Sequence, residues 1–316
     1  MPKDSEFYLF SDIDKSCTEE IRGLGINGNV KVVKGGIELT FTDTPPVSFA
    51  QLKHLPITGF DFSNTQIPSS DEWMQFPVKS LAFPPGISFK FEDLHSFQIK
   101  KLIAEGVQSE DFEKLAKHPL SYLSIPKSNL QQIEFLAAMN LQYLNLGGTA
   151  VDCLQPLESS TELKELDVFK CKINDLSPLA GSSLEMLILT GNSVHELAPV
   201  AEMPLRHLEM RATKIESLDP LSNCPLEVLH LPGSPVSFIG SVLPCPIREL
   251  NIIGLTLKDF DCLQDMSLES LSVSPDKLQK DQFKLLQDLD LQFLVGPGDD
   301  KLQSPQAFFD KYASIF

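Results

Sequence analysis

A period of 21 residues in the apolar positions is the feature that most constrains how this chain of 316 residues can fold. Twelve copies of the pattern Leu-x-x-Leu-x-Leu recur, and nine of their eleven intervals are 21 residues long. The copies open at Ile57, Val78, Ile99, Leu120, Leu141, Leu163, Leu184, Leu205, Leu226, Ile247, Leu268 and Leu291, and a weaker copy opens at Gly36. A period this short indicates one supersecondary unit per repeat, stacked on its neighbours. The sequence therefore predicts a solenoid.

Each repeat opens with a segment in which apolar and polar side chains alternate. The third and fifth residues after the opener are apolar, as in Leu144 and Leu146 or Leu187 and Leu189. This alternation is typical of a half-buried strand, in which neighbouring side chains point to opposite faces. Because every repeat supplies one strand in the same direction, we expect a parallel sheet whose alternate side chains point outward.

A small polar residue stands eight positions after most openers, where the chain must turn away from the strand. These ladder residues are Thr44, Thr65, Ser128, Thr149, Cys171, Asn192, Thr213 and Ser234. Such side chains bond neighbouring backbone groups that would otherwise be buried without a partner. Two positions later an apolar residue is expected to point back into the core, at Ile67, Leu130, Val151, Ile173, Val194, Ile215, Val236 and Leu257.

The return leg of several repeats carries a Leu-x-Pro-Leu stretch. It occurs at 154–157, 176–179 and 218–221, with a variant at 197–200. Proline removes a helical hydrogen bond, and only about a dozen residues are left for the whole return, so long α-helices do not fit. We expect short 3₁₀ turns or extended segments in these legs.

Over residues 36–296 the repeats resemble the short leucine-rich repeats of bacteria, of the internalin-like kind. They are similar in particular to the repeat regions attached to bacterial serine/threonine kinases. The tail adds to this resemblance, because Pro305, Phe308, Phe309, Lys311 and Tyr312 have the spacing with which that family closes its array. Repeats and resemblance together predict an α/β leucine-rich repeat solenoid, with a concave parallel β-sheet and a convex side of short 3₁₀ or extended segments.

The resemblance also implies a role in signalling linked to a serine/threonine kinase. The sequence itself has no strand followed by a kinase-type glycine loop, no His-Arg-Asp triplet and no Asp-Phe-Gly motif. A protein kinase needs all three to hold ATP and its metal ions. We therefore expect no kinase activity from this chain alone.

The uninterrupted repeat predicts a single domain over residues 1–316. We expect residues 1–35 to cap the N-terminal end, 36–296 to form about twelve to thirteen repeats, and 297–316 to cap the C-terminal end. End repeats need caps because a bare end exposes both core side chains and unpaired backbone.

A short helix is predicted within the C-terminal cap. Ser304 and Pro305 form a good helix start, because serine caps the first amides and proline is favoured at the first helical position. Phe308, Tyr312 and Ile315 would then share one face. We expect that face to pack on the last repeat.

Charge excludes some classes of partner. The net charge is −17, from 43 acidic and 26 basic residues, which argues against binding nucleic acid or anionic membranes. A basic protein or a cationic ligand is compatible with this negative charge.

No apolar run has transmembrane length, and the first residues lack the apolar core of a secretory signal. We expect the chain as given to be cytoplasmic and monomeric, or periplasmic or extracellular if it is a fragment of a membrane-anchored protein.

The six cysteines have no metal-binding Cys-x-x-Cys spacing. Cys224 and Cys245 occupy equivalent positions one repeat apart, so their backbones should lie roughly 5 Å apart, within disulfide range. Because a chain without a secretory signal is expected in a reducing compartment, we predict free thiols at this pair. Cys171 takes a ladder position and is predicted to be structural.

The glycines at 23, 25 and 28 formally match the dinucleotide-binding fingerprint. That fingerprint needs a strand before it and a helix after it. Here the helix-like residues 19–22 come first and the strand-like residues 30–33 follow. We therefore expect a turn within the N-terminal cap, and no bound cofactor.

The outward strand positions form the candidate binding site, because large apolar side chains recur there beside charged ones. Counting two, four and six residues from each opener gives Tyr122, Tyr143, Asn145, Glu165, Asp167, Phe169, Met186, Ile188, His207, Glu209, Arg211, Val228, His230 and Ile253. Exposed aromatic and methionine side chains rimmed by charges are typical of a recognition surface. We predict a non-catalytic module that binds a protein or peptide on this face.

Three alternatives use the same residues. Tyr122 and Tyr143 would stand side by side as stacking platforms, which favours recognition of a carbohydrate or cell-envelope component. His207, Glu209 and His230 would lie close together as metal ligands, but a flat sheet seldom converges three ligands, so no metal is expected. Glu165, Asp167 and Glu209 lack the dry pocket that acid-base catalysis requires, so we expect no enzyme activity.

Overall fold

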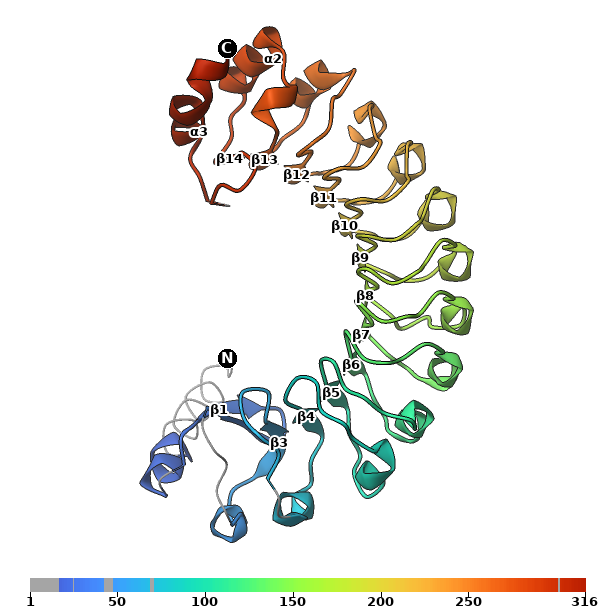
Figure 1. Cartoon of the computed structure of the whole chain (residues 1–316), viewed down its shortest axis with the longest axis vertical. Coiled ribbons are helices and arrows are strands. Elements are labelled where there is room, and N and C mark those ends of the chain that lie inside the picture. Colours follow the sequence, from blue (N-terminus) through green and yellow to red (C-terminus); the bar gives the residue numbers. More distant parts are fainter. Residues whose placement is uncertain (1–16, 25, 43–47, 69–70, 301) are drawn as a thin grey trace, which may run out of the picture. The chain divides into compact units, whose positions relative to one another are not determined.

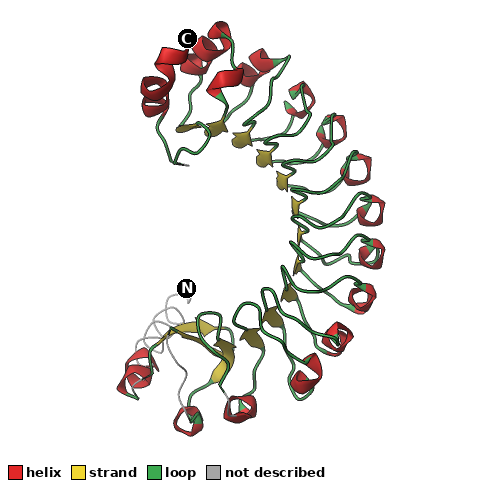
Figure 2. Cartoon of the chain, in the orientation of Figure 1, coloured by secondary structure: helices red, strands yellow, loops and turns green. Residues whose placement is uncertain are grey.

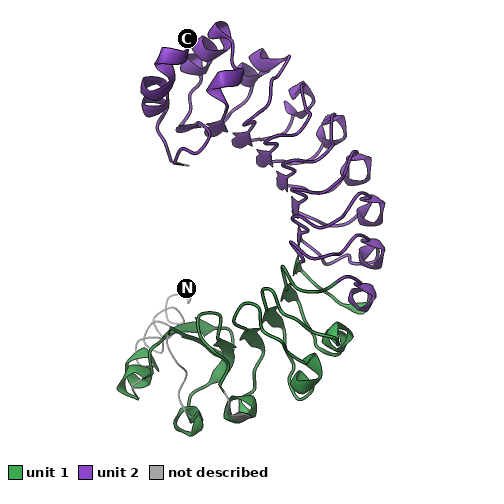
Figure 3. Ribbon diagram, viewed as in Figure 1, with its two compact units in different colours: residues 1–130, 138–145 green, residues 131–137, 146–316 purple. Residues whose placement is uncertain are grey.

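In a computed structural model of the chain, the structure describes residues 17–24, 26–42, 48–68, 71–300 and 302–316. Two compact units divide the chain (Figure 3). Unit 1 comprises residues 1–130 and 138–145, and unit 2 comprises residues 131–137 and 146–316. The single domain expected over residues 1–316 stays a prediction, as do its caps at 1–35 and 297–316, and residues 1–16 lie outside the described part.

Within the described residues, fourteen strands follow one another in chain order. Unit 1 contains β1 (Gly28–Val33), β2 (Gly36–Phe41), β3 (Ile57–Asp61), β4 (Ser80–Ala82), β5 (Lys101–Ile103), β6 (Tyr122–Ser124) and β7 (Tyr143–Asn145). Unit 2 contains β8 (Glu165–Asp167), β9 (Met186–Ile188), β10 (His207–Glu209), β11 (Val228–His230), β12 (Glu249–Asn251), β13 (Ser270–Ser272) and β14 (Phe293–Val295). Figure 1 labels most of these strands, and Figure 2 shows that, within each unit, the helices lie on the side away from the strands.

The strands from β2 onward pair in parallel within each unit, as the repeat predicts. Residues one repeat apart are directly paired, for example His207 with Val228 and Glu209 with His230 between β10 and β11. In most three-residue strands the central side chain is fully buried, such as Leu208, and its two neighbours are partly exposed. The 21-residue period therefore sets the register of the sheet.

The first strand pair departs from the parallel arrangement. β1 and β2 form an antiparallel hairpin in which Gly28 pairs with Phe41 and Val33 with Gly36. Residues 17–23 are helical, and Gly28 begins β1. The order of helix, turn and strand confirms that these glycines do not have the context of a dinucleotide-binding fingerprint, although Gly25 lies outside the described residues.

The return legs contain the short 3₁₀ helices expected from their prolines. Unit 1 has η1 (Ala50–Leu52), η2 (Asp71–Gln75), η3 (Phe91–Leu94) and η4 (Phe112–Lys117). Unit 2 has η6 (Gln155–Leu157), η7 (Ser177–Leu179), η8 (Ala198–Val200), η9 (Asp219–Leu221), η10 (Gly240–Val242), η11 (Phe260–Asp265), η12 (Pro275–Lys277), η13 (Leu286–Asp288) and η14 (Ala313–Ile315). A further one, η5 (Glu134–Ala138), includes residues of both units.

The ladder residues are buried from Ser128 onward, but they differ in how they bond. Asn192 donates from Nδ2 to the carbonyl oxygens of Val168 at 2.7 Å and Leu189 at 2.9 Å, and its Oδ1 accepts from the Ile173 amide at 3.0 Å. Cys171 donates from Sγ to a carbonyl oxygen at 3.2 Å, which confirms its structural role.

Three positions depart from this scheme. The hydroxyl groups of Ser128 and Ser234 are buried without a hydrogen-bond partner. Ile67 is only partly buried. Thr44 lies outside the described residues.

A second column of residues adopts positive φ angles, five positions after the first residue of the strand in most repeats. In unit 2 it comprises Gly148, Lys170, Gly191, Ala212, Gly233 and Gly254, with φ between 48° and 84°. Glycine adopts this left-handed conformation without strain, whereas a side chain makes it costly. Lys170 and Ala212 are therefore strained exceptions in a turn that otherwise selects glycine.

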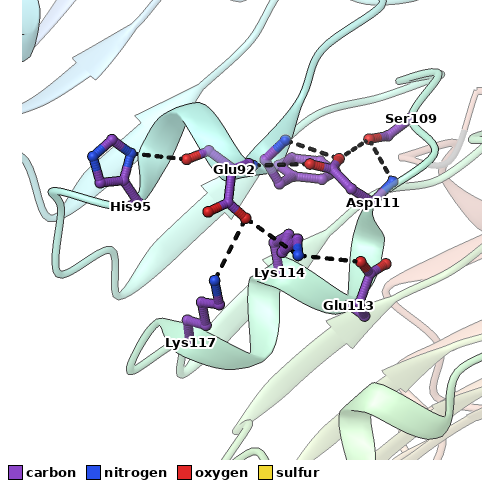
Figure 4. Close-up of polar contacts among 8 residues, drawn as sticks. Glu92, His95, Ser109, Asp111, Glu113, Lys114 and Lys117 are labelled. Atoms are coloured by element: carbon purple, nitrogen blue, oxygen red, sulfur yellow. Dashed lines mark hydrogen bonds and ion pairs between the residues drawn. The ribbon is translucent and has the colours of Figure 1, made fainter.

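Carboxylates connect the 3₁₀ helices of successive repeats (Figure 4). Asp111 accepts hydrogen bonds from the amides of Phe91 at 3.0 Å and Glu92 at 2.9 Å, at the start of η3, and from the Ser109 hydroxyl at 2.6 Å. Asp259 does the same for η10, accepting from the amides of Ile239 and Gly240. These acids satisfy helix-start amides that have no partner within their own short helix.

Two α-helices lie near the C-terminus. The predicted helix is α3 (Pro305–Tyr312), and the Ser304 hydroxyl caps it by accepting from the Ala307 amide at 3.3 Å. Phe308 is fully buried, as expected, but Ile315 is 52% exposed because η14 follows α3 and turns it out of the shared face. The other helix, α2 (Lys280–Leu285), was not predicted, because its return leg lacks the Leu-x-Pro-Leu stretch.

All six cysteines are free thiols in the structure. Cys224 and Cys245 are buried, and their Sγ atoms donate to the carbonyl oxygens of Ala201 at 3.5 Å and Leu221 at 3.3 Å. Burial raises the pKa of the Cys224 thiol to about 11, and the neighbouring Cys245 adds to the effect. These thiols are therefore protonated at neutral pH and poor nucleophiles.

Candidate functional site

The outward positions of the strands form a surface that we call the strand face. Within each unit it consists of the first and third residues of each strand and the residue two positions further on. All fourteen residues predicted for the site are exposed or partly exposed, and Phe169 is 37% exposed. Their spacing from the repeat openers thus correctly predicts which way they point, while their role in binding stays a prediction.

In unit 1 the strand face contains Tyr122, Tyr143 and Asn145. The two tyrosine rings stack on each other, with centroids 4.0 Å apart and planes inclined by 2°. The Nζ atom of Lys101, on the strand preceding Tyr122, lies 5.4 Å from the Tyr122 ring centroid. Stacking thus occupies one face of each ring, and a cation approaches the Tyr122 ring as well.

In unit 2 the first and third residues of the strands form two parallel columns of the strand face. The first column runs through Glu165, Met186, His207, Val228 and Glu249, and the second runs through Asp167, Ile188, Glu209, His230 and Asn251. Three of these side chains, Met186, Ile188 and Val228, are aliphatic and partly exposed, and each has a charged or titratable neighbour in its column. The strand face of unit 2 is therefore a mixed apolar and acidic surface.

Phe169 and Arg211 lie at the edge of this surface. Both follow their strands by two residues and are exposed. The Nζ atom of Lys170 lies 5.0 Å from the centroid of the Phe169 ring, so a cation already sits against this aromatic side chain. Phe169 is one of the few large apolar side chains that the described residues expose above one third.

Next to these columns, unit 2 contains a hollow of about 650 Å³ in the strand face. Its lining includes the carboxylates of Glu209, Glu227, Glu249, Glu269 and Asp299. Val228, Ile253, Phe293, Val295 and Leu302 provide apolar surface in the same lining. The hollow therefore favours ligands that combine positive charge with apolar groups.

The C-terminal segment supports one side of this hollow. Asp299 accepts a hydrogen bond from the Tyr312 hydroxyl at 3.0 Å and from the Gly296 amide at 3.0 Å, and it forms an ion pair with Lys311. Burial would raise the pKa of Asp299, but these donors outweigh it and lower the pKa. The Lys311 and Tyr312 of the tail motif thus hold the loop between β14 and α3.

The side chains of His207, Glu209 and His230 converge on one another. His207 Nε2 lies 3.0 Å and His230 Nδ1 lies 3.7 Å from Oε1 of Glu209. One potential ligand atom from each residue lies within 4.8 Å of the others. The three side chains therefore lie close together, as their places on adjacent strands predict, and their potential ligand atoms come nearer to one another than a flat sheet usually allows.

A fourth side chain fixes this cluster. His230 Nε2 lies 2.8 Å from Oε1 of Glu249, so the imidazole of His230 lies between two carboxylates. The rings of His207 and His230 have centroids 5.8 Å apart and meet edge to face. All four side chains retain some exposure to solvent.

One carboxylate of the strand face has a raised pKa. Burial raises the pKa of Asp167, and the negative charge of Glu209 raises it further, against a hydrogen bond from the Phe169 amide. That amide donates to Oδ1 at 2.8 Å, as expected where a strand ends in a turn. Asp167 is thus engaged in the turn, and its raised pKa departs from the expectation that the carboxylates of this face lie in surroundings too open to shift a pKa.

Part of this surface was not predicted from the sequence. Glu249 and Asn251 stand two and four residues after the opener Ile247, which is the same spacing that identified the other residues. Extending that count to the last repeats also gives Ser270, Ser272, Phe293 and Val295, which line the hollow. Gly298 and Asp299 fall seven and eight positions after the opener Leu291, at the turn and ladder positions of the repeat, so the same count also reaches the loop that lines the hollow.

Comparisons with known proteins identify the fold. A scan against protein-family models and a search of curated protein sequences found no match. Among solved structures, an internalin from Listeria monocytogenes is similar with a TM-score of 0.68 and 22% identity, over 82% of this chain and 80% of that one.

Plant receptor ectodomains share the architecture at lower identity. The ectodomain of the Arabidopsis receptor kinase HAESA, in complex with a peptide hormone, has a TM-score of 0.58 and 15% identity, over 81% of this chain and 52% of that one. The ectodomain of GASSHO1/SCHENGEN3 from Arabidopsis has a TM-score of 0.54 and 16% identity, over 81% of this chain and 37% of that one. This chain therefore has the leucine-rich repeat fold, with the short 3₁₀ return legs of a 21-residue repeat.

Proposed function

We propose that this chain is a non-catalytic module that binds a protein or peptide on the strand face of unit 2. The observation that carries the proposal is the arrangement of Met186, Ile188 and Val228 as partly exposed side chains among acidic ones. Apolar side chains supply binding free energy when a partner covers them, and surrounding charges select the partner and its orientation.

The charge of the surface defines the partner. Glu165, Glu209 and Glu249 lie on the two columns, and the hollow beside them adds Glu227 and Glu269. Arg206 and Arg248 offset the last two through ion pairs at the rim. The surface fits a segment that carries lysine or arginine next to aliphatic or aromatic residues.

The fold similarity supports a peptide as the partner. The HAESA ectodomain, which shares this architecture, was solved with a peptide hormone bound. A strand face built from repeats offers the same backbone spacing at every step, so an extended peptide can contact successive columns.

The signalling role follows from the kinase resemblance of the repeats and tail, and it stays a prediction, as do the cytoplasmic location and the monomeric state. No helix in the described part of the chain is long and apolar enough to span a bilayer.

Selection from a displayed random peptide library tests this proposal. We expect the immobilised full chain to enrich peptides that combine basic with apolar residues, and the affinity of a selected peptide to fall as salt is raised. Glu165→Lys should lower the affinity for that peptide at least tenfold. Glu134→Lys on η5, an exposed acid in unit 2, changes the net charge equally and should change the affinity less than twofold. Failure to enrich any peptide, or equal effects of the two variants, would exclude the strand face as the binding surface.

Carbohydrate recognition is less well supported by the geometry. Sugars stack on the open face of an aromatic ring, but Tyr122 and Tyr143 turn one face toward each other at 4.0 Å. A glycan array probed with the full chain separates the two functions, because binding of an uncharged glycan would not depend on Glu165.

A further inference from the structure

The cluster on β10 and β11 has the composition of a transition-metal site. Its donors are two imidazole nitrogens and one carboxylate oxygen, from His207, His230 and Glu209. Two histidines and one glutamate are a known ligand set of zinc, which prefers nitrogen and oxygen donors in a tetrahedral arrangement. Calcium and magnesium prefer oxygen donors alone, so imidazoles disfavour them.

The distances fit such an ion. Tetrahedral zinc with bonds of about 2.0–2.1 Å places its ligand atoms roughly 3.4 Å apart. The separations from Glu209 Oε1 are 3.0 Å to His207 Nε2 and 3.7 Å to His230 Nδ1. Because these values bracket the ideal and all three atoms lie within 4.8 Å of one another, small rotations of the partly exposed side chains would complete the geometry without a movement of the strands.

The second contact of His230 is an independent observation that points to the same ligand. Metal-binding histidines commonly donate their other ring N–H to a carboxylate, which fixes the tautomer and the orientation of the ring. His230 Nε2 lies 2.8 Å from Glu249 Oε1, which leaves Nδ1 facing Glu209. The cluster thus already contains the supporting carboxylate that a metal site requires.

We propose that His207, Glu209 and His230 bind one zinc ion, with Glu249 as the residue that positions His230. Water fills the fourth position, because Glu209 and His230 also line the open hollow of the strand face. The proposal does not depend on a peptide partner, since zinc binding by the chain alone is measurable.

Calorimetric titration of the purified full chain with Zn²⁺, with any polyhistidine tag removed, tests this site. We expect one ion per chain and a melting temperature that rises with added zinc. His207→Ala, Glu209→Gln and His230→Ala should each weaken zinc binding at least about 100-fold, and Glu249→Gln about tenfold. The matched control is His195→Ala, an exposed histidine outside the cluster, which should leave the affinity unchanged.

Two further measurements distinguish the loss of a zinc ligand from the loss of the fold and from zinc binding by cysteine. Melting of each variant in EDTA separates a lost ligand from a lost fold, since these half-exposed side chains should not be needed for folding. Cobalt substitution should give tetrahedral d–d bands without thiolate charge transfer, which excludes binding by an accessible cysteine such as Cys153. The proposal is wrong if the wild-type chain binds no stoichiometric zinc, if His195→Ala weakens binding as much as the cluster variants, or if a thiolate band appears.

Discussion

The carboxylate of Asp111 accepts a hydrogen bond from the backbone amide of Phe91, 20 residues earlier in the chain, at 3.0 Å. The Glu92 amide donates to the same carboxylate at 2.9 Å, so one side chain of a repeat caps the 3₁₀ helix of the repeat before it. The connection joins η3 to the residue that precedes η4 in unit 1 (Figure 4).

Asp111→Ala should therefore destabilise the chain. Removal of the carboxylate leaves two amides without their acceptor, and loss of such a cap costs about 1–2 kcal/mol. Asp93→Ala, an exposed acid within the same helix η3, should change the free energy of unfolding by less than about 0.5 kcal/mol. Urea unfolding followed by circular dichroism measures both, and equal stabilities of the two variants would refute the capping role.

The carboxylate of Asp111 should also make the free energy of unfolding depend on pH in the acidic range. Burial would raise the pKa of Asp111, but hydrogen bonds from Ser109 and from the amides of Glu92 and Phe91 outweigh burial and lower the pKa. Its contribution is thus complete above the unfolded pKa of about 3.9 and is lost as pH falls through the lower folded pKa. The stability difference between wild type and Asp111→Asn should shrink with falling pH across this window, and a difference that stays constant would contradict the assignment.

Turn conformation gives a stabilising prediction. Ala212 has a φ of 53°, at a position where the neighbouring repeats have Gly191 and Gly233. Glycine at this position would relieve the strain of the left-handed conformation, which stabilises the folded chain by about 1–2 kcal/mol. Glycine also makes the unfolded chain more flexible, which offsets about 0.4–1 kcal/mol of that gain. Ala212→Gly should therefore raise the free energy of unfolding by roughly 0.5–1 kcal/mol. At Ala180, whose φ is −55°, the same change should be destabilising; thermal melting of both variants should show opposite signs.

The ladder should respond unequally to alanine. Asn192 makes three hydrogen bonds in the buried turn, so Asn192→Ala should cost about 3 kcal/mol. The Ser234 hydroxyl occupies the equivalent position without a partner, so Ser234→Ala should be neutral or slightly stabilising. Chemical denaturation distinguishes the two, and a comparable loss at both sites would show that Ser234 bonds in solution.

Phe169 offers a test of binding that leaves the fold intact. Its ring is 37% exposed on the strand face, so Phe169→Ala should weaken capture of a selected peptide while the melting temperature changes little. Tyr143→Ala should also lower stability, because it removes the stacking partner of Tyr122, worth about 0.5–1.5 kcal/mol. Tyr143→Phe keeps the stack and serves as the control for the hydroxyl group. A large loss of stability in Phe169→Ala would instead identify it as a core residue.

The fold followed from the period because the repeat determines which side chains are buried. Leu208 and Leu229 lie where the spacing predicts them, and Ser304 caps the predicted helix. The features that the sequence did not reveal depend on local departures from the repeat. The β1 and β2 hairpin lies before the first strong copy, and α2 occupies a return leg without the proline pattern.

The sequence predicted on which side of the sheet the side chains of the candidate site lie, but it did not predict the contacts among them. The spacing shows that His207, Glu209 and His230 face the same side, whereas their convergence depends on side-chain rotamers that no spacing encodes. The stacking of Tyr122 on Tyr143 is of the same kind. Asp299 falls at the ladder position after the opener Leu291, but the period does not encode the hydrogen bond that it accepts from Tyr312 beside the hollow.

The turns of unit 2 are tied to the next repeat by single backbone hydrogen bonds, from Lys170 to Thr190, from Gly191 to Arg211 and from Gly233 to Ile253. These bonds hold each of the three turns to the repeat that follows it, as in other arrays of stacked repeats. Under a pulling force, unit 2 should unravel one repeat at a time, in even steps of chain length, and the intermediates should keep the strand face of every repeat that is still folded.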